Sequence, residues 1–197
     1  GINLADEYIN QRQRYGHWKD SAIRVTGEGA WSMTVVFLTM WEYICGGEED
    51  YNSYRPTALP PIPADRNSGY VQPYTDSPLD GEPVGETVYL NLISKARRYV
   101  YITTPYLIIS DSVNTALCSA AKSGVDVRIM TPHIPDKKII FEVTRAHYEP
   151  LLEAGVRIYE YTPGFVHGKN FAVDDKYATV GSINMDYRSM FLHFEDG

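Results

Sequence analysis

The segment from Phe165 to Glu195 constrains this chain more than any other, because polar side chains recur in it at fixed spacings within an otherwise apolar run. It reads FVHGKNFAVDDKYATVGSINMDYRSMFLHFE. The first half contains the pattern H-x-K-x-x-x-x-D, and the pattern G-S-x-N follows after six further residues. The polar residues of the two patterns are His167, Lys169, Asp174, Ser182 and Asn184.

These patterns are expected to lie on a β-hairpin. Residues 165–173 are extended and apolar, residues 174–176 have turn character, and residues 177–181 have the composition of a second strand. Side chains alternate along a strand, so His167 and Lys169 should share one face, roughly 6 to 7 Å apart. Asp174 has the opposite parity, and we therefore expect it to hold the turn rather than to contact a substrate.

A histidine and a lysine on one face suit a phosphodiester substrate. The reference pKa of histidine, about 6.5, lies near physiological pH, so His167 can attack phosphorus when neutral or protonate a leaving alkoxide when charged. Lys169 adds a positive charge for a phosphoryl oxygen, and Ser182 and Asn184 add neutral donors. This inventory requires neither a metal nor a cofactor. An isolated His-x-Lys pair is more often a strand histidine beside a solvated lysine, but the complete string is far more specific.

Composition limits the class of protein. The chain has 197 residues, of which 44% are hydrophobic and 22% are charged, so it can bury one substantial core or two small ones. Its net charge of −7 argues against a dedicated nucleic-acid binder, because such proteins usually present a basic surface, although a local basic pocket is compatible with it.

Strands and helices alternate in the second part of the chain. The expected strands are residues 70–74, 100–103, 125–131 and 156–159, and the expected helices are residues 85–98, 111–123 and 136–154. Such alternation is typical of an α/β layered domain with a central mixed sheet flanked by helices.

The first part of the chain is organised differently. Residues 22–26 are expected to form a short strand, and the apolar spacing in residues 27–45 predicts a helix. That helix is too short and too rich in Ser, Thr and Glu for a secure membrane span, so we expect it to pack on a core or, alternatively, to lie at a lipid interface. Residues 46–68 lack periodicity and predict a long loop.

The complete string resembles the signature of the phospholipase D superfamily. The likeness extends to Thr104-Pro105-Tyr106, to GHWKD at residues 16–20 and to NMDYRS at residues 184–189, which are similar to segments of the bacterial cardiolipin synthase family. It implies a phospholipase D-like layered fold. It also implies a phosphatidyl transferase that makes cardiolipin from phosphatidylglycerol and a second phospholipid through a phosphohistidine intermediate.

The resemblance also implies roles for the residues of the motif. His167, Lys169 and Asp174 correspond to the catalytic residues, and Ser182 and Asn184 to residues that bind the substrate phosphate. In two-copy members one histidine forms the phosphohistidine and the other is the acid and base. His167 stands in the second copy, which favours the acid/base role.

A second, incomplete copy is expected at the start of the chain. The first residues, GINLAD, resemble SINMD at residues 182–186, so we interpret residues 1–68 as the tail of a truncated first repeat with an apolar helix and a long loop. Residues 69–197 are then the second phospholipase D-like domain. In this interpretation Asn3 is a further phosphate-binding residue. A coincidence of three residues is the alternative.

Each of the two tails is followed by a carboxylate. By resemblance, a carboxylate after one signature orients the histidine of the other copy, which assigns Asp20 to His167 and Glu195 to the missing histidine. Such a carboxylate fixes the tautomer of the imidazole and raises its basicity. The alternative for Asp20 is an exposed turn residue.

The expected partners follow from the same resemblance. They are phospholipid substrates, the membrane surface, and the missing N-terminal half of the enzyme or a second copy of the chain, with no nucleic acid. The expected location is the bacterial cytoplasmic membrane, as the peripheral part of a membrane-anchored enzyme, and the chain alone should be nearly inactive unless it dimerises. The alternatives are a dimeric single-motif phosphodiesterase or nuclease, and a scaffold without activity.

Overall fold

The structure is a computed structural model that describes residues 2–58 and 69–197. It contains two compact units. The first unit, which we call the sheet unit, comprises the residues up to Ala22 together with Asp76–Gly197, and the second comprises Ile23–Thr75. The sequence-predicted repeat boundary at residues 68 and 69 stays a prediction, because compact units and repeats need not divide a chain at the same place.

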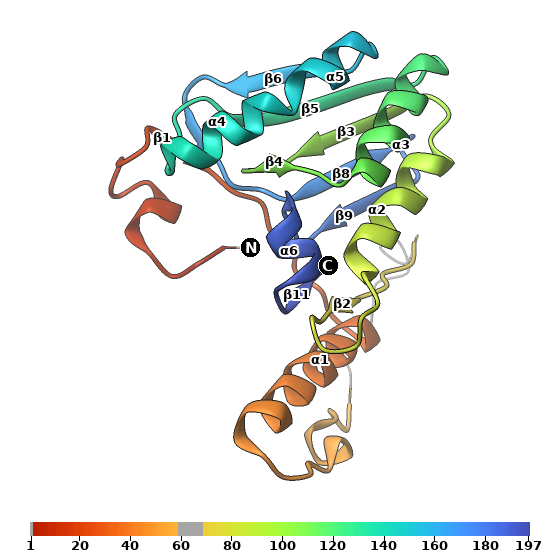
Figure 1. Ribbon diagram of the computed structural model, residues 1–197. Helices are drawn as coiled ribbons and strands as arrows, with labels where there is room; N and C mark the ends of the chain where they lie inside the picture. Colours follow the sequence, from red (N-terminus) through yellow and green to blue (C-terminus); the bar gives the residue numbers. More distant parts are fainter. Residues whose placement is uncertain (1, 59–68) are drawn as a thin grey trace. The chain divides into compact units, whose positions relative to one another are not determined.

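A five-stranded mixed sheet forms the centre of the sheet unit (Figure 1). Its strands, in spatial order, are β6 (Arg157–Tyr161), β5 (Asp126–Pro132), β3 (Tyr99–Thr103), β8 (Asn170–Val173) and β9 (Tyr177–Val180). The first three strands run parallel to one another, whereas β8 is antiparallel to both β3 and β9. The predicted α/β class with a central mixed sheet is confirmed.

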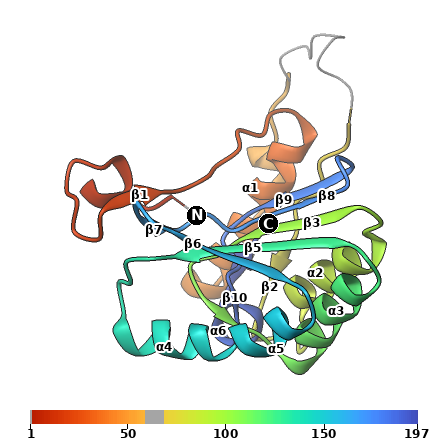
Figure 2. The ribbon, with the colours of Figure 1, turned by 90° about the horizontal axis from the view of Figure 1, so that it is seen from above.

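Helices cover one face of this sheet, as the view from above shows (Figure 2). They are α2 (Val84–Lys95), α3 (Asp111–Lys122), α4 (Lys138–Ala146) and α5 (Tyr148–Glu153). Alternation along β3 explains the core, because Val100 and Ile102 are 0% and 2% exposed while their neighbours in the strand are only partly buried. Phe171 of β8 stacks on Tyr89 of α2 with ring centroids 4.3 Å apart.

Short elements attach the ends of the chain to this unit. The helix η1 (Asp6–Ile9) precedes β1 (His17–Lys19), which pairs in parallel with β7 (Gly164–Val166). Strand β4 (Leu107–Ile108) pairs in parallel with β10 (Met185–Asp186), and α6 (Tyr187–Phe191) follows directly. The remaining short strands are β2 (Thr75–Asp76), where the two units meet in the sequence, and β11 (Glu195–Asp196).

The second unit consists of the helix α1 (Glu28–Cys45), the helix η2 (Tyr51–Tyr54) and their connections. The predicted helix in residues 27–45 is confirmed. The Glu42 carboxylate accepts hydrogen bonds from the Tyr51 hydroxyl and from the Glu49 N–H, and Arg55 forms an ion pair with Glu28. These bonds fold the segment after the helix back along it. Within residues 2–58 and 69–197, none of the helices has the length and apolarity that a bilayer crossing requires.

Several local predictions were wrong. Residues 165–173 do not form one strand, because β7 pairs with β1 whereas β8 pairs with β3, and residues 167–169 lie between the two strands. The predicted helix 136–154 is divided into α4 and α5, since Pro150 has no N–H to donate to the carbonyl of Ala146. Residues 22–26 and 70–74 are not strands.

Candidate active site

Asp20 reaches His167 because β1 and β7 pair in register. Trp18 lies opposite Phe165 and Lys19 opposite Val166, so the next pair in the same register is Asp20 and His167. The backbone N–H of His167 donates to the backbone carbonyl of Lys19 at 2.7 Å, which continues the pairing of β1 and β7 by one residue.

Glycine makes this close pairing of β1 and β7 compatible with the backbone. A Cβ atom at Gly164 would lie 2.5 Å from both the backbone nitrogen and the carbonyl oxygen of His17. A side chain at this position would therefore push the two strands apart. The position of Asp20 beside the imidazole thus depends on a residue three positions before the motif histidine.

The three charged or titratable side chains of the site form one cluster. The carboxylate Oδ2 of Asp20 lies 2.8 Å from Nδ1 of His167, and Nζ of Lys169 lies 2.9 Å from each ring nitrogen. The Lys169 ammonium also donates to the His167 carbonyl at 2.6 Å. The cluster is shielded from water, since the side chains of His167 and Asp20 are 16% and 4% exposed and Lys169 is 5% exposed.

Burial and mutual charges set the ionisation of this cluster. Burial lowers the pKa of His167, and the positive charge of Lys169 lowers it further, whereas the hydrogen bond to Asp20 opposes the shift. Burial also lowers the pKa of Lys169 to about 8, although three carboxylates oppose this shift. Burial opposes ionisation of Asp20, but its hydrogen bonds from His167 and Ser21 outweigh that effect and lower its pKa. Near neutral pH the site therefore holds an anionic carboxylate, a neutral imidazole and an ammonium.

Aromatic rings surround the imidazole and were not predicted from the sequence. The centroids of the Tyr8, Trp18 and Phe165 rings lie 5.2, 5.3 and 6.1 Å from the centroid of the His167 ring. A signal for two of them was present, because Trp18 and Phe165 each stand two residues before a member of the Asp20–His167 pair. Residues two apart on a strand share a face, so this spacing could have placed the two rings on the side of the pair.

Gly168 allows the histidine and the lysine to stand side by side. A Cβ atom at this position would lie 2.8 Å from the Ser21 hydroxyl and 2.8 Å from the Asn170 amide nitrogen. These two groups are hydrogen-bonded to each other at 2.9 Å, which ties the residue after Asp20 to the residue after Lys169. Sequence reasoning gave no role to Ser21 or Asn170.

Comparison with known proteins assigns a family to this arrangement. Residues 89–197 match the protein family described as "Cardiolipin synthase, PLD-like domain". The chain belongs to this family. The chain is 38% identical over 198 residues to a cardiolipin synthase of Geobacillus kaustophilus, and 52% identical over 195 residues to an uncharacterized protein of Streptococcus mutans serotype c.

The match to these relatives is partial on their side. The alignments cover 99% of this chain but 38% of the Geobacillus protein and 41% of the Streptococcus protein, so the chain spans about two fifths of the length of these relatives. The structure is also similar to the crystal structure of a phospholipase D family member, Nuc from Salmonella typhimurium. The TM-score is 0.50 at 20% identity, with 64% of this chain and 80% of that chain covered, and this likeness shows the fold.

The three residues predicted to bind the substrate phosphate have different hydrogen-bond partners. The Ser182 hydroxyl accepts from the Asp196 N–H at 2.9 Å, and its backbone N–H donates to the Asp196 carbonyl at 2.7 Å. The Asn184 amide nitrogen donates to the Ser189 hydroxyl at 3.0 Å, and among the described residues its buried oxygen has no hydrogen-bond donor. Asn3 is exposed and donates to the Tyr8 hydroxyl at 2.7 Å.

The remaining two predicted site residues stand apart from the imidazole. Asp174 lies at the far end of β8, where its carboxylate accepts three backbone N–H bonds, and within residues 2–58 and 69–197 it forms no hydrogen bond with His167 or Lys169. Glu195 lies 3.3 Å from Nδ1 of His193, and its charge favours the charged form of Lys169. The structure therefore brings Asp20 and Lys169 to His167 but places Asp174 at a turn.

Proposed function

We propose that this chain provides the proton-transferring and phosphate-holding part of a cardiolipin synthase-type phosphatidyltransferase. The observation that carries the proposal is the Asp20–His167–Lys169 cluster, in which a carboxylate holds Nδ1 of a neutral imidazole and an ammonium lies beside it. Membership in the cardiolipin synthase family supports the choice of a phospholipid substrate over other phosphodiesters.

In the first half-reaction, a second histidine attacks the phosphorus of phosphatidylglycerol. This histidine comes from another PLD-like copy in the same protein or from a second chain. A nitrogen–phosphorus bond forms, the bond from phosphorus to the glycerol oxygen breaks, and His167 donates a proton to the departing oxygen. The negative substrate phosphate raises the pKa of His167 when it binds, which supplies the protonated imidazole that this step needs.

In the second half-reaction, His167 acts as a base. Its Nε2 takes the proton from a headgroup hydroxyl of another phosphatidylglycerol, whose oxygen attacks phosphorus and displaces the phosphohistidine nitrogen. The products are cardiolipin and the free histidine. The lowered pKa of His167 favours this step, because a neutral imidazole is the competent base.

Lys169 is the cation of the site in this proposal. Its ammonium neutralises a phosphoryl oxygen as charge develops there, a role for which a buried and fixed charge is better suited than a solvated one. Ser182, Asn184 and Asn3 are proposed to hold the other oxygens once the second half of the site is in place. Because both substrates are lipids, we propose that the enzyme works at the bacterial cytoplasmic membrane.

The full-length protein that carries this sequence tests the proposal. In vesicles of phosphatidylglycerol it should release one glycerol for each cardiolipin formed, and His167→Ala should abolish both. His133→Ala is the matched control, because His133 is exposed and also has a carboxylate 2.8 Å from its Nδ1, that of Glu160. Absence of cardiolipin, together with cleavage of DNA in a gel assay, would replace the proposal with a dimeric phosphodiesterase or nuclease. Phosphate trapped on His167 and detected by mass spectrometry would exchange the roles of the two histidines.

A further inference from the structure

A hydrogen bond between Ser21 and Asn170 lies next to the charged cluster and has no part in the proposed reaction. The amide nitrogen of Asn170 donates to the Ser21 hydroxyl at 2.9 Å, across 149 positions of the sequence. Ser21 directly follows Asp20, and Asn170 directly follows Lys169. The bond therefore joins the segment that supplies the carboxylate of the cluster to the segment that supplies its ammonium.

The segment that carries Asp20 has few other attachments. Strand β1 ends at Lys19, and beyond Ala22 the chain passes into the second unit. Within residues 2–58 and 69–197, residues 20–26 form hydrogen bonds to other segments only from Asp20 to His167 and between Ser21 and Asn170. If the second bond were lost, only the contact with the imidazole itself would hold the carboxylate in place.

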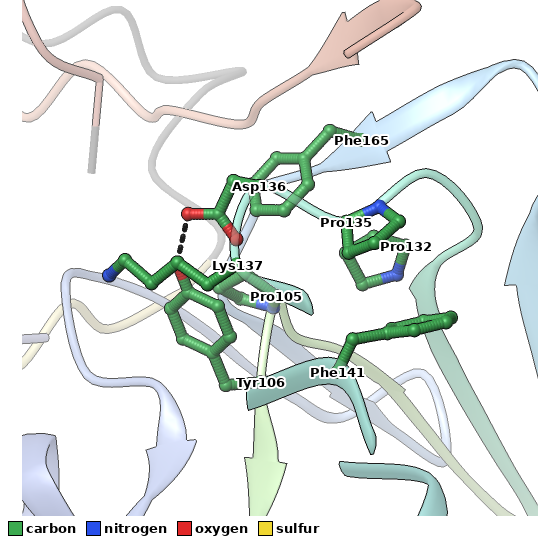
Figure 3. Close-up of a pocket in the computed structure, with 8 residues that line it drawn as sticks. All are labelled: Pro105, Tyr106, Pro132, Pro135, Asp136, Lys137, Phe141 and Phe165. Atoms are coloured by element: carbon green, nitrogen blue, oxygen red, sulfur yellow. Dashed lines mark hydrogen bonds between the residues drawn. The ribbon is translucent and has the colours of Figure 1, made fainter. Parts of the chain in front are cut away.

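The segment that carries His167 is held differently, by packing in the core. Phe165 and Val166 are 1% and 2% exposed. The Phe165 ring lines a small pocket together with Pro132 and Tyr106 (Figure 3). Because the core fixes the strand before the imidazole, the carboxylate is the member of the Asp20–His167 pair whose position depends on a side-chain hydrogen bond.

Ser21 connects this hydrogen bond to the carboxylate. Its backbone N–H donates to Oδ1 of Asp20 at 2.8 Å, while Oδ2 of the same carboxylate lies 2.8 Å from Nδ1 of His167. Asn170 in turn belongs to β8, which lies between β3 and β9 in the central sheet. A continuous series of hydrogen bonds thus runs from the central sheet through Asn170 and Ser21 to the imidazole.

Asn170 is unfavourable for its local structure. Asparagine is depleted in β-strands, and β8 is an interior strand of the five-stranded sheet. The amide oxygen of Asn170 is buried, and among the described residues it has no hydrogen-bond donor, which costs stability. Residues that conflict with their local structure are expected at functional sites. The position of Asn170 therefore indicates a role other than stabilising the sheet.

We propose that Ser21 and Asn170 are positioning residues whose hydrogen bond holds the Asp20 carboxylate against Nδ1 of His167 during phosphatidyl transfer. The proposal rests on the proposed function and adds to it two residues that act through Asp20.

A double-mutant cycle tests this role in the full-length protein, with kcat for cardiolipin formation in phosphatidylglycerol vesicles as the measurement. Ser21→Ala and Asn170→Leu should each lower kcat about tenfold, because each removes one partner of the bond. In an Asp20→Asn background the same substitutions should lower kcat less than about twofold, because the anion that the bond positions is already absent. Ser21→Ala leaves strand β8 intact, so it carries the test even if Asn170→Leu fails to fold.

The thermal midpoint separates positioning from stability. Leucine is similar in shape to asparagine but has no polar atoms, so Asn170→Leu should leave the midpoint unchanged or raise it while kcat falls. Asn114→Leu is the matched control. Asn114, on α3, also has a buried amide oxygen without a hydrogen-bond donor among the described residues, and its replacement should leave kcat unchanged.

The outcomes distinguish this inference from the proposed function. If the wild-type protein makes no cardiolipin, the proposed function fails. If it does, and Ser21→Ala and Asn170→Leu both keep the wild-type kcat, the positioning role is wrong while the transferase remains. If the two substitutions lower kcat by the same factor with Asp20 and with Asp20→Asn, the bond does not act through Asp20 and the inference is overturned.

Discussion

Asp20 and His167 are 147 positions apart in the sequence, yet a carboxylate oxygen of the first lies 2.8 Å from Nδ1 of the second. The register of β1 and β7 creates this contact, because Asp20 and His167 directly follow the paired residues Lys19 and Val166. The imidazole is thereby fixed with Nδ1 toward the carboxylate, while Nε2 lies 2.9 Å from the Lys169 ammonium.

Replacing Asp20 by Asn should slow phosphatidyl transfer by about 100-fold or more, because the imidazole loses the anion that supports its protonated form. The measurement is kcat for cardiolipin formation by the full-length protein, with Asp175→Asn, at an exposed turn position, as the control. A rate equal to that of the wild type, with the variant folded, would show that Asp20 does not orient His167.

Activity should fall as pH rises through about 8, because burial lowers the pKa of Lys169 to about 8. Below this pH the side chain is an ammonium, which would hold a phosphoryl oxygen. Above it, the fraction of molecules with a charged Lys169 falls about tenfold per pH unit. The pH profile of kcat/KM is the measurement. In Lys169→Arg the guanidinium stays charged, so the alkaline decline near pH 8 should disappear even if the rate is lower. A decline that persists unchanged in this variant would assign it to another group.

Asp174→Ala should lower the thermal midpoint, because the carboxylate accepts backbone N–H bonds that hold the start of β3. The donors are Arg97, Arg98 and Tyr99, at 2.7, 2.9 and 2.8 Å. The bond from Tyr99, with the other two, lowers the pKa of Asp174 below its ordinary 3.8 although burial opposes this. Its contribution to stability is therefore complete above pH 3.8 and is lost as pH falls through the lower folded value.

The difference in thermal midpoint between the wild type and Asp174→Ala should accordingly narrow only below about pH 3.8. Asp80→Ala, at an exposed turn, is the control and should leave the midpoint nearly unchanged. An unchanged midpoint together with a loss of activity as large as that of His167→Ala would give Asp174 a direct catalytic role.

Much of the fold followed from local patterns. The apolar alternation of residues 100–103 and the helical spacing of residues 27–45 gave the right elements, because burial on one face imposes a period on a strand or a helix. The pattern failed in residues 165–173, where two strands with different partners follow each other in one apolar run. Hydrophobic periodicity reports which side chains are buried, and it does not indicate where a chain changes from one neighbouring strand to another.

The residues of the candidate site also include some that were predicted from the sequence and some that were missed. His167 and Lys169 were found because they lie two residues apart, and a spacing of two is visible in a sequence. Tyr8 was missed, because its ring reaches the imidazole from the N-terminal helix η1. A contact between segments that are remote in the sequence has no characteristic spacing by which it could be predicted.

The sequence by itself determined the family and the mixed α/β fold, because these depend on residue types at short, fixed spacings. Only the tertiary structure decided the ionisation of His167 and Lys169 and the strand register that brings Asp20, which the family resemblance had paired with His167, to 2.8 Å from its Nδ1. The physical reason is that burial and charge–charge distances are set by segments that pack together from remote parts of the chain.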